Sequence, residues 1–365
     1  MASDRKIKVL EISSYPPPRA GWGVRVQFVK KALEAQGHEC KVLNIGKSRK
    51  MKSTEFVGAA SGWDYTKKVF GFCRSGYLIH MHMNGQSPKG LVLALIAAVA
   101  GMLLGRRCLL TFHAGADQKF FPREKNGLIA PVFSMLFRMA QRIICNDGVV
   151  KSKIVDYGIG ETKVHDIPAF SRQYLEVRSE TLPPGLDAFF EKHDPILASY
   201  LLLRPTFNID TLFHAIKELT STFPNLGLVV MGSNTTSDDM DPSDVKRLEA
   251  RLQLESHIFW AGDLPHDQFI TILSKTKMYV RTYIYDGVSS SVLEALALKV
   301  PVVACENPHR PPGVLQFKNG DLKDLTEKIR SALEHYETFQ AEIVVPQIKD
   351  TVKDEVDLLI AAYAS

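Results

Sequence analysis

Short hydrophobic runs alternate with amphipathic segments along the first half of the chain. Residues 8–12 and 39–43 have the length and composition of buried strands, and residues 24–36 between them repeat apolar positions at helical spacing up to Gly37. A strand, a glycine-containing loop, a helix and a second strand form a βαβ unit. Further strands are expected at residues 77–82, 108–112 and 142–145. The first half therefore predicts a doubly wound parallel sheet.

The alternation becomes irregular after Phe170 and resumes near residue 196. In the second half, strands are expected at residues 196–203, 226–231, 258–261, 278–281 and 300–304, with helices at residues 209–221, 244–253, 268–274 and 290–298. We therefore predict an α/β fold with two Rossmann-like domains, residues 1–175 and 176–350, that face each other across a cleft. Ligands of such proteins bind at the carboxyl ends of the strands.

The composition agrees with a folded chain of two domains. The 365 residues are 45% hydrophobic and 23% charged, which is near the globular average and excludes a disordered polyelectrolyte. The five cysteines are scattered without C-x-x-C spacing, which argues against a disulfide framework or a structural zinc site. This cysteine usage and the lack of a signal-peptide pattern at the start predict a cytoplasmic protein.

Charge is distributed unequally between the two halves. Residues 1–170 contain 26 Lys and Arg against 12 Asp and Glu, whereas residues 171–365 contain 19 against 28. The basic half suits an anionic membrane surface or a phosphate-bearing substrate. Nucleic acid is not the expected partner, because no zinc-ligand spacing or RNA-binding signature accompanies the charge.

One segment could contact lipid. Residues 90–105, GLVLALIAAVAGMLLG, contain no charge and lie between Lys89 and Arg106. As a helix they would span about 24 Å at ~1.5 Å per residue, less than the ~30 Å hydrocarbon core of a bilayer. A core helix beside the sheet and a helix that dips into a membrane both fit this pattern.

Residues 285–305, YDGVSSSVLEALALKVPVVAC, carry the most specific chemistry. Asp286 and Glu294 are eight residues apart, and Ser289 and Ser290 open a predicted helix between them. Free backbone N–H groups and the positive dipole end of a helix form an anion site. Glu294 could then bond a vicinal diol such as a ribose. In the alternative interpretation, a serine caps the helix and Asp286 is a turn residue.

The same segment resembles the Glu-x7-Glu signature of retaining family-4 glycosyltransferases, which have the GT-B fold. The resemblance implies that Asp286 is a catalytic residue facing the donor sugar and that Glu294 holds the nucleotide ribose. It also implies that the intervening backbone meets the diphosphate and sugar hydroxyls, at Gly287, Val288, Ser289 and Ser290.

Segments of the first half extend the resemblance. Residues 18–39 are similar to the glycine-rich loop and first helix of that family, so Gly21 and Gly23 would approach the donor phosphates. LLTFHAG at residues 109–115 is similar to a strand ending in a histidine, which implies that His113 contacts the donor and helps to position the acceptor. Asp117 and Arg123, which follow, would reach the acceptor. By the same resemblance, a helix within residues 351–365 would cross back to the first domain.

The second half contains both matches and departures. LVVMGS at residues 228–233, with Gly232, and WAGDLPHDQF at residues 260–269 resemble the strand and loop around the nucleobase. Arg204 occupies the arginine of the family variant Arg-Pro-x-Lys-Asn, but Phe207 replaces its lysine. Asp286 is one methylene shorter than the usual Glu. We therefore expect either a reorganised diphosphate site or low activity.

Three other patterns have ordinary explanations. SDDMD at residues 237–241 mimics an acid-x-acid metal box but is expected to be a solvated loop. His80 and His82 share one face of a strand and could bind metal, but without a carboxylate or cysteine nearby in sequence they are expected to line the core or the cleft. The basic residues 47–52 are either a solvated loop or a contact with phospholipid headgroups.

By resemblance, the expected function is transfer of a hexosyl group from a nucleotide-diphosphate sugar to a lipid-linked or saccharide acceptor, in surface polysaccharide or glycolipid synthesis. We expect that the protein needs no cofactor and no metal. We also expect it to make peripheral contact with an anionic membrane. The alternative is a weak or inactive GT-B protein that binds a nucleotide sugar or acts as a scaffold. An epimerase or phosphorylase is disfavoured because no motif of either appears.

Overall fold

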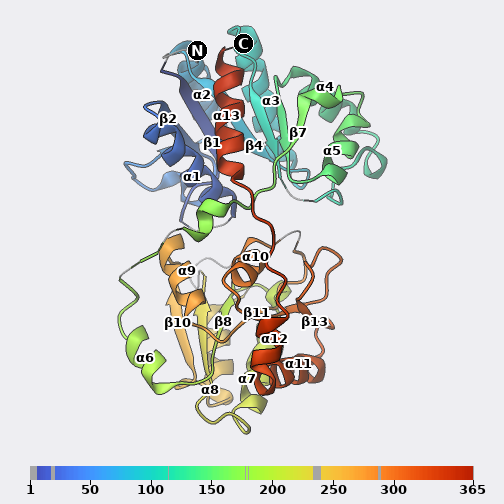
Figure 1. Ribbon diagram of the computed structural model, residues 1–365. Helices are drawn as coiled ribbons and strands as arrows, with labels where there is room; N and C mark the ends of the chain where they lie inside the picture. The colour runs from blue at the N-terminus through green and yellow to red at the C-terminus, as the bar shows by residue number, and fades with distance from the viewer. Residues whose placement is uncertain are drawn as a thin grey trace. The chain divides into compact units, whose positions relative to one another are not determined.

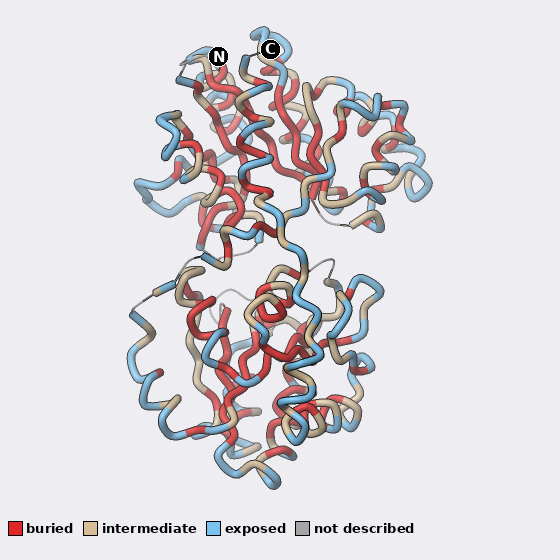
Figure 2. Tube along the Cα trace, in the orientation of Figure 1, coloured by how far each residue is buried: buried red, intermediate tan, exposed pale blue. Residues whose placement is uncertain are grey.

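The structure is a computed structural model that describes residues 6–17, 21–113, 115–176, 178–179, 181–232, 240–286 and 289–364. The chain divides into two compact units (Figure 1). Unit 1 comprises Met1–Gln173 and Lys349–Ser365, and unit 2 comprises Tyr174–Ile348. Figure 2 shows that buried residues follow the strands inside each unit.

Unit 1 is built on a seven-stranded parallel sheet in the order β3-β2-β1-β4-β5-β6-β7. Its strands are β1 (Lys8–Ser13), β2 (Glu39–Asn44), β3 (Val57–Gly58), β4 (Leu78–Met83), β5 (Leu109–Phe112), β6 (Ile143–Cys145) and β7 (Val164–Asp166). Its helices are α1 (Gly21–Ala35), α2 (Gly62–Arg74), α3 (Pro88–Leu103), α4 (Ala130–Met139), α5 (Gly148–Val155) and α13 (Thr351–Ala364). Chain order reverses between β1 and β4, which is a topological switch point.

The two faces of this sheet differ in chemistry. Leu10, Ile79 and Leu110 pack in one hydrophobic core with residues of α2, α3 and α4. Successive strand residues point to opposite faces. The intervening positions, which include Glu11 and His80, therefore face the other side of the sheet. There the buried side chains of α13 and α1 meet them, so this face contains a buried polar cluster.

Helix α13 belongs to unit 1 although it lies at the end of the chain. Its Glu355 forms a buried ion pair with Arg25 of α1, with Nη2 to Oε2 at 2.6 Å, and Arg25 Nη1 also donates to Thr351 Oγ1 at 2.8 Å. Figure 1 shows α13 running alongside the sheet next to β1. This pairing, together with apolar packing of Val352 and Val356, attaches the helix to unit 1.

Helix α3 contains the apolar segment that raised the question of lipid contact. Ala94, Ala97 and Ala98 are fully buried against the sheet. On its outer face Val92 is 55% exposed and Leu103 is 66% exposed. No helix in the described part of the chain is both long enough and apolar enough to cross a membrane. The segment is therefore a core helix that also presents apolar side chains outward.

Unit 2 is built on a six-stranded parallel sheet in the order β10-β9-β8-β11-β12-β13. Its strands are β8 (Ile196–Tyr200), β9 (Gly227–Met231), β10 (Ile258–Gly262), β11 (Met278–Arg281), β12 (Val302–Cys305) and β13 (Leu315–Phe317). Its helices are α6 (Leu186–Lys192), α7 (Ile209–Leu219), α8 (Pro242–Arg251), α9 (His266–Ser274), α10 (Ser290–Ala297), α11 (Leu322–Glu334) and α12 (Tyr336–Ala341). Its switch point lies between β8 and β11.

Candidate functional site

The candidate donor-binding residues of unit 2 gather at the carboxyl ends of β8, β9 and β11. Arg204 follows β8, Gly232 follows β9, and Asp286 follows β11 just before α10. Parallel strands align their carboxyl ends at one edge of the sheet, so residues far apart in sequence meet there.

Asp286 lies in a cage of two arginines. Arg281 holds it in a bidentate pair, with Nε to Oδ2 at 2.9 Å and Nη2 to Oδ1 at 2.8 Å. Arg310 Nη1 donates to the same Oδ2 at 2.8 Å. Burial alone would raise the pKa of Asp286, but the two guanidinium groups lower it, so the carboxylate remains ionised. Both oxygens that were expected to face a sugar therefore already accept hydrogen bonds from arginine.

Phe207 is a core residue. Its side chain is 3% exposed and stacks on Tyr283 with ring centroids 4.5 Å apart. The Arg281 guanidinium lies 5.4 Å from the Phe207 ring centroid, within range of a cation–π contact. A lysine at this position would point into the hydrophobic core of unit 2. Phe207 therefore packs inside unit 2, at the position where the family variant has its lysine.

The start of α10 fits the anion site that the sequence suggested. Within the described residues, the Ser289 hydroxyl bonds the Ser291 hydroxyl at 3.1 Å rather than capping the helix. Ser291 also accepts a hydrogen bond from the Tyr279 hydroxyl at 2.8 Å. The Ser289 side chain therefore caps none of the first N–H groups of α10, and such groups at a helix start can bind a ligand. Gly287 and Val288 lie outside the described residues.

Glu294 lies on α10 with a side chain that is almost completely buried. Its Oε1 is 3.4 Å from Nε2 of His266, whose own N–H is directed to the carbonyl oxygen of Tyr174 at 3.1 Å. Burial raises the pKa of Glu294 to about 8 and lowers the pKa of His266 to about 4. Both groups are therefore neutral at pH 7, and no charged side chain among the described residues forms an ion pair with the carboxyl. A buried carboxyl whose charge is not compensated by a neighbouring cation is typical of a ligand-binding position.

Gly232 is required by the backbone. Its φ is +119°, and a Cβ there would come within 2.2 Å of the Leu201 carbonyl oxygen. Only glycine fits such a position. Arg204 begins the turn after β8, where its carbonyl oxygen accepts a hydrogen bond from the Phe207 N–H at 3.0 Å. These two positions shape the loops around the carboxyl edge of the sheet.

The two glycines of the first loop differ in their surroundings. Gly21 is exposed at the start of α1, and a Cβ there would meet nothing within 4 Å. Gly23 is buried, and a Cβ there would come within 2.9 Å of Pro16 Cδ. Gly23 therefore has a packing role, whereas space remains around Gly21. Between them, the Trp22 indole stacks on the His113 imidazole with centroids 4.2 Å apart.

His113 directly follows β5 and is 2% exposed. Its Nε2 is 2.9 Å from His82 Nδ1, and His82 Nε2 is 2.7 Å from Glu11 Oε2. His80 bonds the same carboxylate through Nδ1 at 3.0 Å. His80 and His82 are buried, as the sequence predicted, and their carboxylate partner Glu11, which is distant in sequence, comes from the neighbouring strand β1. Period-2 alternation on all three strands was the signal that could have found it.

Glu11, His80 and His82 also have ligating atoms within 4.8 Å of one another, a spacing that an ion could share. These atoms already pair with each other, since one carboxylate accepts hydrogen bonds from two imidazoles.

The two residues expected to reach the acceptor substrate, Asp117 and Arg123, are not part of this cluster. Asp117 is exposed and pairs with Lys125, and Arg123 Nη1 donates to the Asp156 carbonyl oxygen at 3.3 Å.

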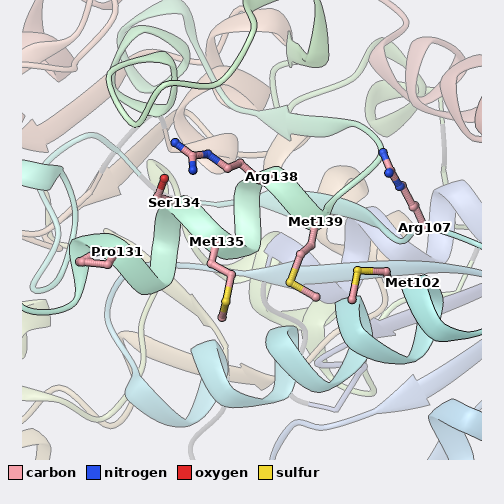
Figure 3. A pocket seen from close by; sticks show the side chains of 7 residues that line it. All are labelled: Met102, Arg107, Pro131, Ser134, Met135, Arg138 and Met139. Atoms are coloured by element: carbon pink, nitrogen blue, oxygen red, sulfur yellow. The ribbon is translucent and has the colours of Figure 1, made fainter.

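Unit 1 has an open groove of about 380 Å³ between α3 and α4 (Figure 3). Met102 and Met135 reach into it and are each 49% exposed. Arg107 and Arg138 extend along its rim. The groove therefore combines apolar side chains with positive charge.

Comparison with known proteins identifies the architecture. Residues 187–341 match the family described as glycosyl transferases group 1. Over whole chains, the structure is similar to Anabaena HepE crystallised with UDP, at 14% identity, 98% coverage of both chains and a TM-score of 0.60. It is similar to a glycosyltransferase from Rickettsia africae at 15% identity, 97% coverage of this chain and 98% of that one, with a TM-score of 0.63. A putative UDP-N-acetylglucosamine 2-epimerase from Listeria monocytogenes has 16% identity, covers 99% of this chain and 97% of its own, and has a TM-score of 0.65.

At these identities the whole-chain similarity concerns the fold, and it confirms the predicted pair of Rossmann-like domains. The family match covers most of unit 2, including both α10 and the residues that cage Asp286. The protein thus has the GT-B fold, and its residues 187–341 are similar to the group 1 glycosyl transferases.

Proposed function

We propose that the protein is a retaining glycosyltransferase that moves a hexosyl group from a nucleotide-diphosphate sugar to a lipid-linked or saccharide acceptor. Unit 2 holds the nucleotide and unit 1 the acceptor. Retention follows from attack on the same face that the diphosphate leaves, with the leaving phosphate taking the acceptor proton. The chain then supplies positioning and charge, and no metal is needed.

The observation that carries this proposal is the buried Glu294 carboxyl in the second turn of α10. A neutral carboxyl next to unsatisfied helix N–H groups is costly unless a ligand uses both. A nucleotide diphosphate does so, because its ribose diol donates to the carboxyl and its phosphates accept from the N–H groups. Anabaena HepE has been crystallised with UDP-glucose. UDP-glucose is therefore the first donor to test.

The experiment is a thermal-shift panel with UDP, GDP, ADP and their common sugars at millimolar concentration. Binding to the folded state raises the midpoint with the logarithm of ligand concentration over dissociation constant. We expect one nucleotide to raise the midpoint selectively, and Glu294→Gln to reduce that rise. Glu306→Gln, at an exposed carboxyl of the same unit, is the matched control. A flat panel with folded protein would contradict the proposal.

For the acceptor side, we propose that unit 1 meets an anionic bilayer with the groove between α3 and α4. Apolar Met102 and Met135 would enter the lipid boundary while Arg107 and Arg138 contact headgroup phosphates. Neighbouring Leu103, at 66% exposure, extends the apolar surface.

Co-sedimentation with vesicles tests this surface. The wild-type protein should pellet with phosphatidylcholine vesicles containing phosphatidylglycerol, and less with pure phosphatidylcholine, since each basic side chain near an anionic surface contributes about 1 kcal/mol. Leu103→Asp should reduce pelleting. Val149→Asp, at an apolar residue of unit 1 that is 63% exposed at the start of α5, should not. Equal pelleting of the two variants would refute the assignment of this surface.

A second candidate function is favoured by the Asp286 cage. With both of its oxygens engaged by Arg281 and Arg310, and with Phe207 buried, the protein could bind a nucleotide sugar without transferring it. Turnover discriminates between the two functions. UDP release from UDP-glucose, with water or an added acceptor, supports the enzyme, whereas saturable binding without UDP release supports a binding or scaffold protein.

A further inference from the structure

Unit 1 contains a buried row of hydrogen-bonded side chains that leads to His113. The row consists of the carboxylate of Glu11 on β1 and the imidazoles of His82 on β4 and His113 after β5. Strand register brings them together, since Glu11 pairs with His80 and His82 pairs with Thr111 across adjacent strands. Each side chain of the row is at most 2% exposed. Such a row of polar groups on one face of a sheet is costly unless every member has a defined partner.

The direction of these hydrogen bonds follows from the carboxylate end. Burial alone would raise the pKa of Glu11, but the charge of His80 and the hydrogen bonds from both imidazoles lower it to about 2. An ionised carboxylate only accepts hydrogen bonds. His82 Nε2 must therefore carry a hydrogen and donate to Glu11 Oε2. Burial and the nearby His80 lower the pKa of His82, so His82 is neutral and its Nδ1 is an acceptor.

The same logic continues to His113. Since His82 Nδ1 accepts, the hydrogen between the two rings belongs to His113 Nε2. Burial, together with the neighbouring imidazoles, holds the pKa of His113 well below its ordinary value. His113 Nδ1 then carries a lone pair. Within the described residues this buried atom has no hydrogen-bond partner, and Trp22 fixes the ring by stacking on it.

We propose that Glu11 and His82 are positioning residues that hold His113 in the Nε2–H form, so that its Nδ1 accepts a hydrogen bond from a hydroxyl group of the bound substrate. The Glu11 carboxylate fixes the orientation of the His82 ring, and the His82 ring in turn fixes the orientation of the His113 ring. Sugars and saccharide acceptors supply such hydroxyls, so this role rests on the proposed glycosyl transfer. The orientation itself is a property of unit 1 and can be measured without any ligand.

His80 is a branch of the network rather than a member of the row. It bonds Glu11 on one side and Thr111 Oγ1 at 2.7 Å on the other. Its Nδ1 also lies 3.9 Å from Oε1 of Glu355. The other oxygen of Glu355, Oε2, pairs with Arg25. Thr111 therefore offers a matched control, because Thr111→Val removes a buried hydrogen bond of the same network without touching the His82–His113 contact.

The test is nitrogen NMR of the wild-type protein labelled with ¹⁵N-histidine, without ligand. We expect the His113 proton on Nε2, with a scalar coupling across the hydrogen bond to His82 Nδ1, and an unprotonated Nδ1. The His113 signals are assigned by their loss in His113→Asn. A His113 proton on Nδ1, or a shared zinc ion whose removal by a chelator changes the Glu11, His80 and His82 environment, would overturn the proposal.

The variants then test the role. In folded His82→Leu, we expect the rate of UDP release from UDP-glucose to fall roughly 10- to 100-fold, as when an outer partner of a functional histidine is lost. Affinity for UDP should change less than about twofold, as the nucleotide is held by unit 2, and Thr111→Val should leave both near wild type. A folded His82→Leu that matches Thr111→Val in rate would refute the positioning role. Failure of wild type to bind UDP-glucose would instead refute the proposed function and leave the NMR result to judge the orientation.

Discussion

Binding of a nucleotide sugar should release a proton from Glu294. The buried carboxyl has a pKa of about 8, so it is protonated in the free protein at pH 7. A protonated carboxyl has one good acceptor oxygen, whereas a ribose diol offers two donors and needs the ionised form. If binding returns the group to an ordinary pKa near 4.5, about 0.9 proton leaves per ligand bound at pH 7.

The sign of the pH effect follows from this release. Below pH 8 the competent, ionised form becomes scarcer, so the apparent affinity should weaken about tenfold for each pH unit, and above pH 8 it should level off. His266 has a pKa of about 4 and stays neutral over this range, so it adds no proton of its own. The pKa of Asp286 is lowered by its arginines, so Asp286 stays ionised.

Isothermal titration calorimetry with UDP-glucose in buffers of different ionisation enthalpy measures the released proton directly. UDP-glucose is preferred to UDP because its diphosphate has no group that titrates near pH 6. Binding to the Glu294→Gln variant should release no proton. Binding of the 2′-deoxyribose analogue to the wild-type protein should also release none if the carboxyl needs both hydroxyls. A proton release near zero at pH 7, or equal affinities at pH 6 and pH 8 in the wild-type protein, would refute the assignment of Glu294 to the ribose.

Three stability predictions follow from the packing of each unit, measured by urea unfolding followed by circular dichroism. Phe207→Lys should destabilise the protein by at least the ~3–5 kcal/mol typical of removing a buried aromatic ring, with no gain in nucleotide affinity; tighter UDP binding would show that the side chain reaches the diphosphate after all. Gly232→Ala should lower the free energy of unfolding by about 1–3 kcal/mol or more, because φ is positive there and the new Cβ would strike a carbonyl oxygen. Gly262→Ala should lower it by only about 1–2 kcal/mol, because φ is +75° but a Cβ would meet nothing within 4 Å. Equal losses of stability in the two variants would contradict the role of the close approach. Arg25→Met should cost about 3–5 kcal/mol by leaving Glu355 buried without its partner, and adding Glu355→Leu should recover part of that loss; additive losses would argue against the pair.

The fold was largely accessible from the sequence because its signals are local. A buried parallel strand needs a short apolar run, and a helix needs apolar positions at helical spacing, so β11 and α7 begin at the residues that the pattern indicates. The short edge strands β3, β7 and β13 were missed, since two or three residues carry no periodicity. The start of α10 was also visible, because serines, a glycine and two acids are close together in the chain.

The chain by itself determined which residue types are available at each strand end, and it determined the helix that carries Glu294. Only the tertiary structure decided their partners. Asp286 became a caged ion because Arg281 and Arg310 reach it from the end of β11 and the loop after β12. Glu11 joined His82 although 71 residues separate them, because β1 and β4 are neighbours in the sheet. Hydrogen bonds and ion pairs act over about 3 Å of space whatever the separation along the chain, so the environment of a site residue is set by strand order and register.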